Sequence, residues 1–436
     1  MTDMNNNQLK VLMIVEQCNP DWSSVPLEGY NYFQEISKLV DVTLVTHERN
    51  KTSLTEKAES NEIIYIEESA FIKKYYELTS KLMNFLFKGR SNWPLKNALN
   101  YPIYAEFNHK VYQQFKDEIL RGDYEIVHAL TPMMPRYPVK VVKVCKKIPF
   151  LLGPVNGGVP FPPGFQETAK QEFAQFNFLR AIGRALIPGY VETYKKADRI
   201  LSGSSFTLNM LKDMFQMTDE RIRLFYENGI SSNFLNVDKT VDKSENKVEL
   251  LFVGRLVPYK CADVVLEAIG QLEPELQNKI HFTIVGDGSE KSNLEAQVQR
   301  LNLEKLVTLT GWVKQAETLE YYKKADVFCF PSIREFGGAV VLEAMACGLP
   351  CIVANNGGIG EYVTEATGFK IEPLSREYLT KELTQKIKIL VEDETLRNNM
   401  SNQAIERARE FTWDNKAKKI VEIYEDTIEA KQTIAS

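Results

Sequence analysis

Residues 328–348 read FCFPSIREFGGAVVLEAMACG, in which an apolar run, a glycine-containing loop and a helical pattern follow one another. The run predicts a strand that ends at Pro331, and Gly348 predicts the end of the helix. Glycines at such a turn let a ligand approach the backbone, and the free amides at a helix start suit a diphosphate. Glu335 stands in the loop and Glu343 about two turns into the helix, which predicts an anion site with an acid on each side. The alternative, solvated surface acids beside a tight turn, fits the spacing as well.

A second strand end in the same half of the chain carries two cations. Residues 252–260 read FVGRLVPYK, which places Arg255 and Lys260 directly after an apolar run. Arginine binds phosphate oxygens in a planar, bidentate arrangement and lysine acts as a point charge, so both suit a diphosphate. The carboxyl ends of parallel strands share one edge of a sheet, where open α/β folds bind ligands. The two segments together predict a diphosphate site, and the alternative is that both cations are exposed ion-pair partners.

Short apolar runs alternate with amphipathic stretches along both halves of the chain, which is typical of parallel strands joined by crossover helices. The strands that we expect are residues 10–16, 41–46, 63–66, 126–129, 149–153, 199–202, 248–254, 280–286, 307–311, 326–331 and 350–354. The expected fold class is therefore α/β, with two Rossmann-like, doubly wound domains that face each other across a cleft.

The length of 436 residues suits two domains. The segment 228–246 is polar and turn-rich, as a crossing between domains commonly is. We therefore expect an N-terminal domain at 1–230 and a C-terminal domain at 231–412. A last helix lies within 413–436, and its return to the N-terminal domain is an expectation that the pattern alone does not fix.

Composition argues against several functional classes. The chain has 53 Lys and Arg against 58 Asp and Glu, a formal net charge of −5, so nothing draws it as a whole to nucleic acid. No apolar run approaches the roughly 18 residues of a membrane span, and we expect a cytoplasmic protein, at most bound to the inner face of the membrane. The cysteines show no metal-ligand spacing, and no GxGxxG follows the first strand, which argues against a metal site and an NAD cofactor.

Four motifs in this chain match those of one enzyme family. They are GR at 254–255 with Lys260, ENG at 227–229, the acid pair E-x7-E of Glu335 and Glu343, and NGGIGEYV at 356–363. The ordered set resembles family 4 glycosyltransferases of the GT-B fold, the retaining glycosyl transferases of group 1. The resemblance covers essentially the whole chain and is densest in its second half.

The resemblance implies a nucleotide-sugar donor bound by the C-terminal domain. It implies Arg255, Lys260 and Glu335 as catalytic residues, with the cations on the diphosphate and the acid on the donor sugar. Other donor-binding positions that it implies are Gly29, Gly254, Gly286, Trp312, Val313, Phe336, Gly337, Gly338, Ala339, Val340 and Glu343. Among these, Glu343 holds the ribose, and the backbone of the loop before it caps the phosphates and the sugar.

On the acceptor side, the resemblance points to the N-terminal domain. At the position where the family has a functional histidine, this chain has Leu130. His128, at the strand end, is the expected replacement. The alternative is that His128 is a structural histidine, hydrogen-bonded within the protein. The Gly- and Pro-rich loop GPVNGGVPFPPGF follows a strand. We expect Asn156, Gly157 and Gly158 in it to donate backbone hydrogen bonds to donor or acceptor, with a purely structural turn as the alternative.

The implied reaction is sugar transfer with retention of anomeric configuration. No DxD triplet occurs, so we expect no metal and no cofactor, with Arg255 and Lys260 in the role that a divalent ion has elsewhere. UDP is the expected nucleotide, and the expected acceptor is a saccharide or lipid-linked saccharide in cell-surface glycan or polysaccharide biosynthesis. A sugar-nucleotide epimerase of the same fold and an inactive nucleotide-sugar-binding protein are the alternatives.

Residues 178–196, FLRAIGRALIPGYVETYKK, mix apolar and basic side chains. The pattern is compatible with an amphipathic helix on a membrane surface, and so with a peripheral membrane contact. An ordinary helix with its apolar face on the core is the alternative.

Overall fold

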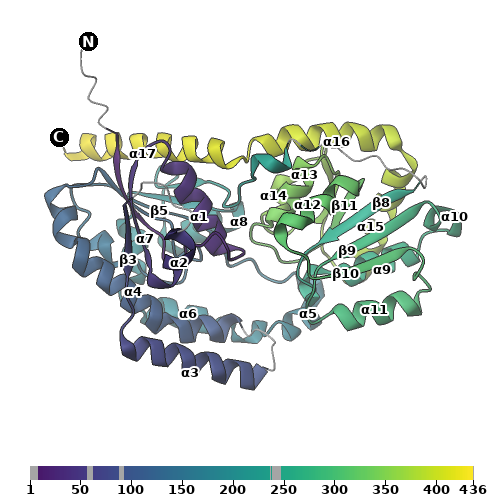
Figure 1. Ribbon diagram of the computed structural model, residues 1–436, viewed down its shortest axis with the longest axis horizontal. Helices are drawn as coiled ribbons and strands as arrows, with labels where there is room; N and C mark the ends of the chain where they lie inside the picture. The colour runs from purple at the N-terminus through teal and green to yellow at the C-terminus, as the bar shows by residue number, and fades with distance from the viewer. Residues whose placement is uncertain (1–7, 56–61, 88–92, 236, 238–246, 436) are drawn as a thin grey trace, which may run out of the picture. The chain divides into compact units, whose positions relative to one another are not determined.

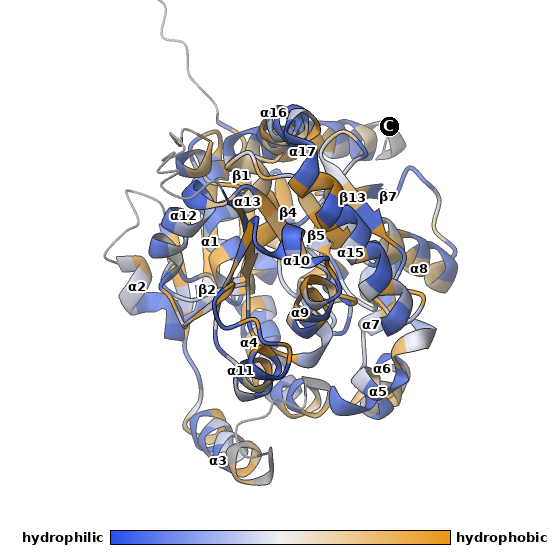
Figure 2. Cartoon of the chain, turned by 90° about the vertical axis from the view of Figure 1, so that its right-hand side faces the viewer, coloured by the Kyte–Doolittle hydropathy of each residue, from blue (hydrophilic) through white to orange (hydrophobic). Residues whose placement is uncertain are grey.

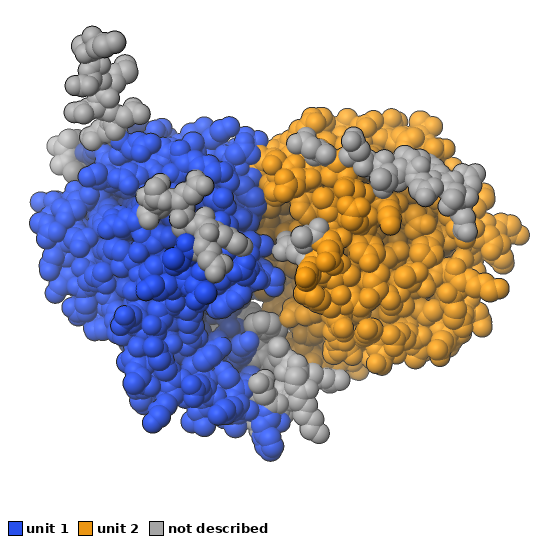
Figure 3. Space-filling view, viewed as in Figure 1, with its two compact units in different colours: residues 1–158, 175–227, 413–436 blue, residues 159–174, 228–412 orange. Residues whose placement is uncertain are grey.

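The computed structural model describes residues 8–55, 62–87, 93–235, 237 and 247–435. Contacts within the chain divide it into two compact units, coloured separately in Figure 3. Unit 1 comprises residues 1–158, 175–227 and 413–436, and unit 2 comprises residues 159–174 and 228–412. Of the crossing expected at 228–246, residues 236 and 238–246 lie outside the described residues.

Unit 1 is built on a parallel sheet with the strand order β3-β2-β1-β4-β5-β6-β7 (Figure 1). Its strands are β1 (Lys10–Ile14), β2 (Asp41–His47), β3 (Glu62–Ile66), β4 (Ile126–Ala129), β5 (Phe150–Val155), β6 (Arg199–Ser202) and β7 (Ile222–Leu224). Its helices are α1 (Val25–Ile36), α2 (Lys51–Thr55), α3 (Ala70–Phe87), α4 (Trp93–Arg121), α6 (Phe178–Leu186), α7 (Tyr190–Lys196), α8 (Ser205–Phe215) and α17 (Trp413–Ala435). The central strands β1 and β4 are almost wholly buried, because helices cover both faces of a parallel sheet.

Unit 2 repeats this architecture with the strand order β10-β9-β8-β11-β12-β13. Its strands are β8 (Val248–Val253), β9 (Ile280–Val285), β10 (Val307–Gly311), β11 (Val327–Phe330), β12 (Cys351–Ala354) and β13 (Gly368–Ile371). Its helices are α5 (Gln166–Gln171), α9 (Ala262–Gly270), α10 (Pro274–Gln277), α11 (Lys291–Arg300), α12 (Gln315–Lys324), α13 (Ala339–Ala346), α14 (Ile359–Tyr362), α15 (Arg376–Glu392) and α16 (Glu394–Arg409). In the described parts of both units, we find no helix with the length and apolar character needed to cross a membrane.

The prediction of two doubly wound parallel sheets is confirmed. The sequence pattern does not predict β7 and β13, the last strand of each sheet. Both are edge strands of three or four residues, and β7 buries only Ile222. A short, half-exposed strand leaves too few apolar residues to form a recognisable run.

Residues 159–174, which we call the inserted segment, stand in the sequence of the expected N-terminal domain but pack in unit 2. The Nε of Arg334 donates to the carbonyl of Val159 at 2.8 Å, and Gly164 lies so close to Leu374 that an added Cβ would stand 1.9 Å from its carbonyl oxygen. A single boundary near residue 230 is therefore corrected: the chain passes into unit 2 and back before its crossing after Glu227.

Helix α17 packs in unit 1, although it follows unit 2 in the sequence. Ala417, Ile420 and Tyr424 lie on one face of the helix and are buried in a core cluster that also contains Val11 and Met13 of β1. Three apolar residues at this spacing form a stripe that needs a partner surface, which the sheet and helix α1 provide.

Candidate functional site

The two strand ends of unit 2 that the sequence singles out meet in a direct contact. Lys260 ends a short turn after β8, and Glu335 lies in the loop after β11. The Lys260 ammonium contacts the Glu335 carboxylate, and the hydroxyl of Ser332 donates to Glu335 Oε2 at 3.2 Å. The Lys260 and Glu335 side chains are 12% and 15% exposed. The pair is therefore largely shielded from water, which strengthens its electrostatic interactions, while part of each side chain stays accessible.

Arg255 extends this charged edge. It follows β8 directly and is exposed, and its Nη2 donates to the Tyr259 hydroxyl at 3.0 Å. Strands β8 and β11 are neighbours in the sheet, so their carboxyl ends lie side by side. With two cations and one carboxylate, the group formed by Arg255, Lys260 and Glu335 keeps a positive charge that suits an anion.

A glycine pair after β12 holds the Glu335 loop in place. The amide of Gly358 donates to the carbonyls of Glu335 and Phe336 at 3.1 and 2.9 Å. Gly357 has a φ of +95°, and an added Cβ would stand 1.8 Å from the Glu335 carbonyl oxygen. Only glycine combines this backbone conformation with so close an approach.

Helix α13 begins where the sequence predicts the anion site. Gly338 has a φ of +73°, and an added Cβ there would stand 2.4 Å from Ile359 Cγ2. The helix starts at the next residue, Ala339. The first amides of a helix have no helical acceptors and lie at its positive dipole end. The backbone from Gly337 to Val340 therefore supplies hydrogen-bond donors for an anion.

Glu343 lies closer to this helix start than the sequence suggests. It is the fifth residue of α13, about 6 Å from Ala339 at 1.5 Å per residue, rather than two turns into the helix. The side chain is buried, and the hydroxyl of Tyr322 on α12 donates to its Oε2 at 2.9 Å. Tyr322 thereby fixes the orientation of a carboxylate near the backbone amides at the start of α13.

The remaining donor-side positions lie at the ends of β8, β9 and β10. The amide of Gly286 donates to the Gly311 carbonyl at 3.0 Å, and an added Cβ at Gly286 would stand 1.9 Å from the Gly254 carbonyl oxygen. Gly254 and Gly286 thus come together because no side chain separates these strand ends. Trp312 follows β10 and is 71% exposed, and Val313 beside it is half-buried, so both present apolar surface at this edge of the sheet.

Arg334 joins the Glu335 loop to the inserted segment. Its Nε donates to the Val159 carbonyl at 2.8 Å. Its guanidinium lies 4.9 Å from the centre of the Phe161 ring and 5.1 Å from that of Phe336. A guanidinium between two aromatic faces gains cation–π attraction from both. Arg334 therefore positions the loop that carries Glu335.

Arg334→Ala is expected to raise the dissociation constant for UDP, the probe nucleotide, about tenfold, because the loop loses both ring contacts and the hydrogen bond. Calorimetric titration measures the effect. Phe161→Leu is expected to weaken binding in the same direction, and Phe161→Tyr, which keeps the aromatic face, serves as the matched control. Unchanged affinity in both Arg334→Ala and Phe161→Leu would show that the loop is held without this contact.

His128 lies in the core of unit 1, not at an open strand end. It is fully buried, with Nε2 2.6 Å from the Gly153 carbonyl oxygen and Nδ1 2.6 Å from the Tyr424 hydroxyl. Because a carbonyl only accepts, Nε2 donates to Gly153 and Nδ1 accepts from Tyr424. Burial lowers the pKa of His128 to about 4, so the ring is neutral. The expectation of an acceptor-side role is therefore corrected: His128 is a satisfied core histidine.

The loop after β5 is also satisfied within unit 1. The amide of Asn156 donates to the Met133 carbonyl at 2.6 Å, and the amide of Gly157 donates to Thr207 Oγ1 at 3.0 Å. An added Cβ at Gly158 would stand 2.7 Å from Met210 Sδ on α8. These bonds correct the expectation that Asn156 and Gly157 donate backbone hydrogen bonds to a ligand, and Gly158 is explained by close packing on α8.

Gly29 lies inside helix α1 and is buried. An added Cβ would stand 2.5 Å from the Gln17 carbonyl oxygen and 2.8 Å from Val15 Cγ1. An amide at this position of a helix is bonded to the preceding turn. The expected backbone contact of Gly29 with a phosphate or sugar is corrected: the residue lets α1 pack against the end of β1.

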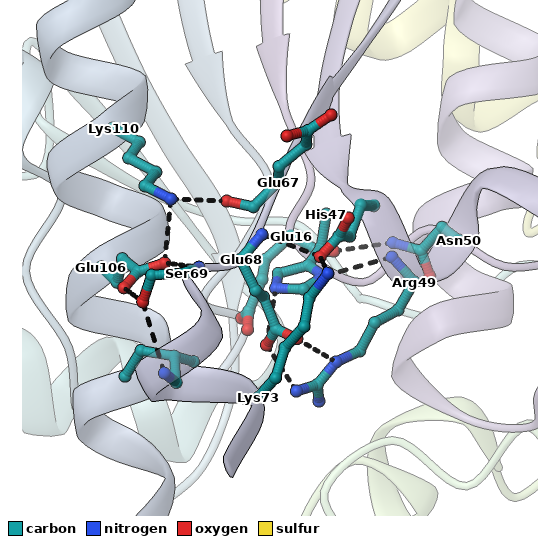
Figure 4. A network of polar contacts seen from close by, with 12 residues as sticks. Glu16, His47, Arg49, Asn50, Glu67, Glu68, Ser69, Lys73, Glu106 and Lys110 are labelled. Atoms are coloured by element: carbon teal, nitrogen blue, oxygen red, sulfur yellow. Dashed lines mark hydrogen bonds and ion pairs between the residues drawn. The ribbon is translucent and has the colours of Figure 1, made fainter. Parts of the chain in front are cut away.

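The carboxyl edge of the unit 1 sheet carries a polar network that the sequence reading does not include (Figure 4). Glu68, after β3, pairs with Arg49 and lies 3.2 Å from Nε2 of His47, the last residue of β2. The Arg49 amide donates to His47 Nδ1 at 3.2 Å, so His47 donates through Nε2 and is neutral. Glu16, after β1, is half-buried near the charges of Arg49 and Arg136. Open α/β sheets bind ligands at this edge.

Glu16→Gln tests the charge state of this network. Burial raises the pKa of Glu16 from its ordinary value of 4.5 to about 7, although Arg49 and Arg136 oppose the shift. The folded state then holds a proton that the unfolded state releases, so stability falls as pH rises from 4.5 to 7. At pH 8 the variant is expected to be more stable than the wild type by on the order of 1–3 kcal/mol, and at pH 4 to be nearly equal.

Urea unfolding at the two pH values measures this difference. Glu77→Gln removes a carboxylate from an exposed position of α3 and serves as the matched control. An equal stability difference between Glu16→Gln and the wild type at both pH values would contradict a raised pKa.

Several site residues carry no sequence signal, or one that is recognised only afterwards. Tyr322 lies on a helix with no motif, and its partnership with Glu343 is a product of the fold. Arg334 precedes Glu335 in the loop that the sequence already indicates as part of a ligand site. Glu16, His47 and Glu68 each end or follow a strand, so the strand-end rule that found Arg255 would have found them too.

Residues 235–407 match the family model of the glycosyl transferases group 1. An uncharacterised glycosyltransferase of Methanocaldococcus jannaschii is 26% identical over 251 residues, which cover 55% of this chain and 63% of that protein. A D-inositol 3-phosphate glycosyltransferase of Kineococcus radiotolerans is 30% identical over 193 residues, which cover 41% of this chain and 44% of that protein. The chain thus spans about half the length of these relatives.

Solved structures resemble the chain over nearly its whole length. HepE of Anabaena, in complex with UDP, has a TM-score of 0.62 at 16% identity and covers 96% of this chain and 100% of its own. WaaG, a glycosyltransferase involved in lipopolysaccharide biosynthesis, has a TM-score of 0.59 at 16% identity and covers 95% of this chain and 99% of its own. At this level of identity, the likeness concerns the fold.

Proposed function

We propose that this protein is an enzyme that moves a sugar from a nucleotide-sugar donor to an acceptor hydroxyl. Two findings support the proposal: residues 235–407 match the model of the glycosyl transferases group 1, and the fold is GT-B. The observation that carries the proposal is the Lys260–Glu335 contact at the carboxyl edge of the unit 2 sheet, with exposed Arg255 beside it. The two cations suit the diphosphate, and the carboxylate suits sugar hydroxyls.

In this proposal the donor's diphosphate is the leaving group. Arg255, Lys260 and the amides at the start of α13 stabilise the charge that develops as its bond to the sugar breaks. Glu335, held by Lys260 and Ser332, accepts hydrogen bonds from the donor sugar. Glu343, oriented by Tyr322, accepts from the ribose hydroxyls.

The proposed stereochemical course is retention. The acceptor hydroxyl attacks the anomeric carbon on the face that the diphosphate leaves, and a diphosphate oxygen takes the hydroxyl proton. The charge of the leaving group is met by protein cations, so the proposed transfer needs no metal and no cofactor. It is of the hexosyltransferase type.

UDP is the proposed nucleotide of the donor. Structures of HepE, which shares the fold, are described in complex with UDP and with UDP-glucose, and this favours UDP as the first nucleotide to test. Exposed Trp312 and half-buried Val313, after β10, are the proposed surface for the base.

The proposed acceptor is a saccharide or lipid-linked saccharide in cell-surface glycan or polysaccharide biosynthesis. WaaG, another protein of the same fold, is described as acting in lipopolysaccharide biosynthesis, which supports an acceptor of this class. Within unit 1, the network around Glu16, Arg49 and Glu68 offers both donors and acceptors of hydrogen bonds to sugar hydroxyls.

A thermal-shift panel of UDP-, GDP- and ADP-sugars, each with and without EDTA, tests the donor assignment. A ligand at about 100 times its dissociation constant adds about 2.7 kcal/mol of stability, which shifts the melting temperature measurably. We expect a shift with UDP-sugars that EDTA leaves unchanged. A shift that EDTA abolishes would contradict metal-independent binding.

Transfer itself is followed by NMR of the anomeric proton, which reports retention or inversion in the product. Donor alone serves as the control: formation of an isomer without acceptor would indicate an epimerase, and binding without any turnover would indicate an inactive binding protein. No shift with any sugar nucleotide would overturn the proposal.

A further inference from the structure

Helix α3 exposes a stripe of apolar side chains. Phe71, Leu78, Leu82 and Phe85 are 74%, 66%, 46% and 80% exposed. At 3.6 residues per turn these four residues fall within about 60° of the helix circumference, so they form one continuous line along its length. A line of large, exposed apolar residues is uncommon on a protein surface and indicates an interaction site.

A different face of α3 packs against the rest of unit 1. Ile72 and Thr79, which point about 100° away from the middle of the stripe, are buried, and the hydroxyl of Tyr75 donates to the Leu99 carbonyl of α4 at 2.9 Å. Figures 1 and 2 show α3 at the margin of unit 1, beyond α4. The stripe is therefore not the face that attaches the helix to its unit.

Lysines border the stripe on one side. Lys74 and Lys81 are exposed and lie within about 40° of its edge. The sequence of α3 contains a single acid, Glu77, which lies about 100° from the middle of the stripe. A helix with aromatic and leucine side chains on one face, flanked by lysine, matches a helix that lies in the interface of an anionic membrane.

Helix α6, which lies within residues 178–196, also exposes apolar side chains. Ile182 and Leu186, one turn apart, are 45% and 73% exposed, while Tyr190 and Tyr194 of the following helix are buried. Helices α3 and α6 both pack on α4. Each of the two helices thus presents exposed apolar residues, and both attach to unit 1 through α4.

We propose that the stripe on α3 docks this protein on the surface of an anionic lipid membrane. Apolar side chains enter the headgroup region, and the lysines meet lipid phosphates. A second copy of the chain fits less well, because antiparallel packing of two stripes brings the lysine-bearing flank of each helix against that of the other. The proposal does not depend on the proposed transferase activity.

Flotation with vesicles tests the proposal on the full chain. The wild type is expected to float with phosphatidylcholine vesicles that contain phosphatidylglycerol, more weakly with phosphatidylcholine alone, and less as salt rises. The double variant Leu78→Glu/Leu82→Glu is expected to lose vesicle binding on the order of tenfold or more. Leu120→Glu, at a leucine of α4 that is 47% exposed against 46% for Leu82, is the matched control and is expected to float like the wild type.

Two results would overturn the proposal. One is a wild type that floats with neither vesicle, and the other is a double variant that floats as well as Leu120→Glu. If light scattering shows a wild-type dimer that the double variant does not form, and the wild type does not float, the stripe is a contact with a second copy of the chain. The donor panel is run on the same preparations, so a failure of docking is distinguished from a failure of the proposed function.

Discussion

Lys260→Ala is expected to lower kcat/KM for sugar transfer by about 10²–10³-fold, the loss that follows when one preorganised charge on a developing anion is removed. Two effects act together. The diphosphate loses a cation, and Glu335 loses the ammonium that it contacts, so the carboxylate next to the site is left without its countercharge. The effect should fall on kcat as well as on KM, because the charge on the diphosphate is largest in the transition state.

Steady-state kinetics with a UDP-sugar measure this effect. Lys388→Ala, which breaks an ion pair with Glu273 on the surface of unit 2, is the matched control and is expected to leave kcat/KM unchanged. Arg255→Ala is expected to act in the same direction as Lys260→Ala. Near-normal turnover in both Arg255→Ala and Lys260→Ala would remove the basis for a diphosphate site at this edge.

Gly357→Ala is expected to displace the loop that carries Glu335. The new Cβ would stand 1.8 Å from the Glu335 carbonyl oxygen, at a φ of +95° that alanine rarely adopts. The two backbones must separate, which displaces Glu335 and breaks the bonds from Gly358 to the loop. We expect a loss of at least about 3 kcal/mol in stability and of about 10²-fold or more in UDP affinity, because both the clash and the backbone conformation are unfavourable.

Gly122→Ala separates the two causes. Gly122 has a φ of +86°, close to that of Gly357, but an added Cβ there meets no atom within 4 Å. The control variant is expected to lose about 1–2 kcal/mol from backbone conformation alone and to bind UDP as the wild type does. If Gly357→Ala is no less stable than Gly122→Ala and binds UDP equally well, the loop is not held by this close approach.

The fold brings together residues that the sequence singles out for the donor side, whereas it satisfies those expected on the acceptor side internally, and the reason is physical. Arg255, Lys260, Glu335 and Gly338 stand in short segments whose strand, loop and helix form locally, and the sheet then brings the strand ends together. His128 shows the opposite case. Its surroundings include the hydroxyl of Tyr424, 296 residues away in the sequence, and no local pattern indicates that α17 returns to cover it.

Alternating apolar and amphipathic runs determined the two doubly wound sheets, because the spacing of buried residues along a strand or helix is a local property of the chain. Glycines at strand ends, such as Gly338 and Gly357, were also visible in the sequence, but the close approaches that require them exist only in the fold. Tertiary structure alone decided where polar groups find partners across long separations, such as Arg334 with the inserted segment. It also decided which apolar faces remain exposed, since the pattern of α3 alone does not say which side α4 covers.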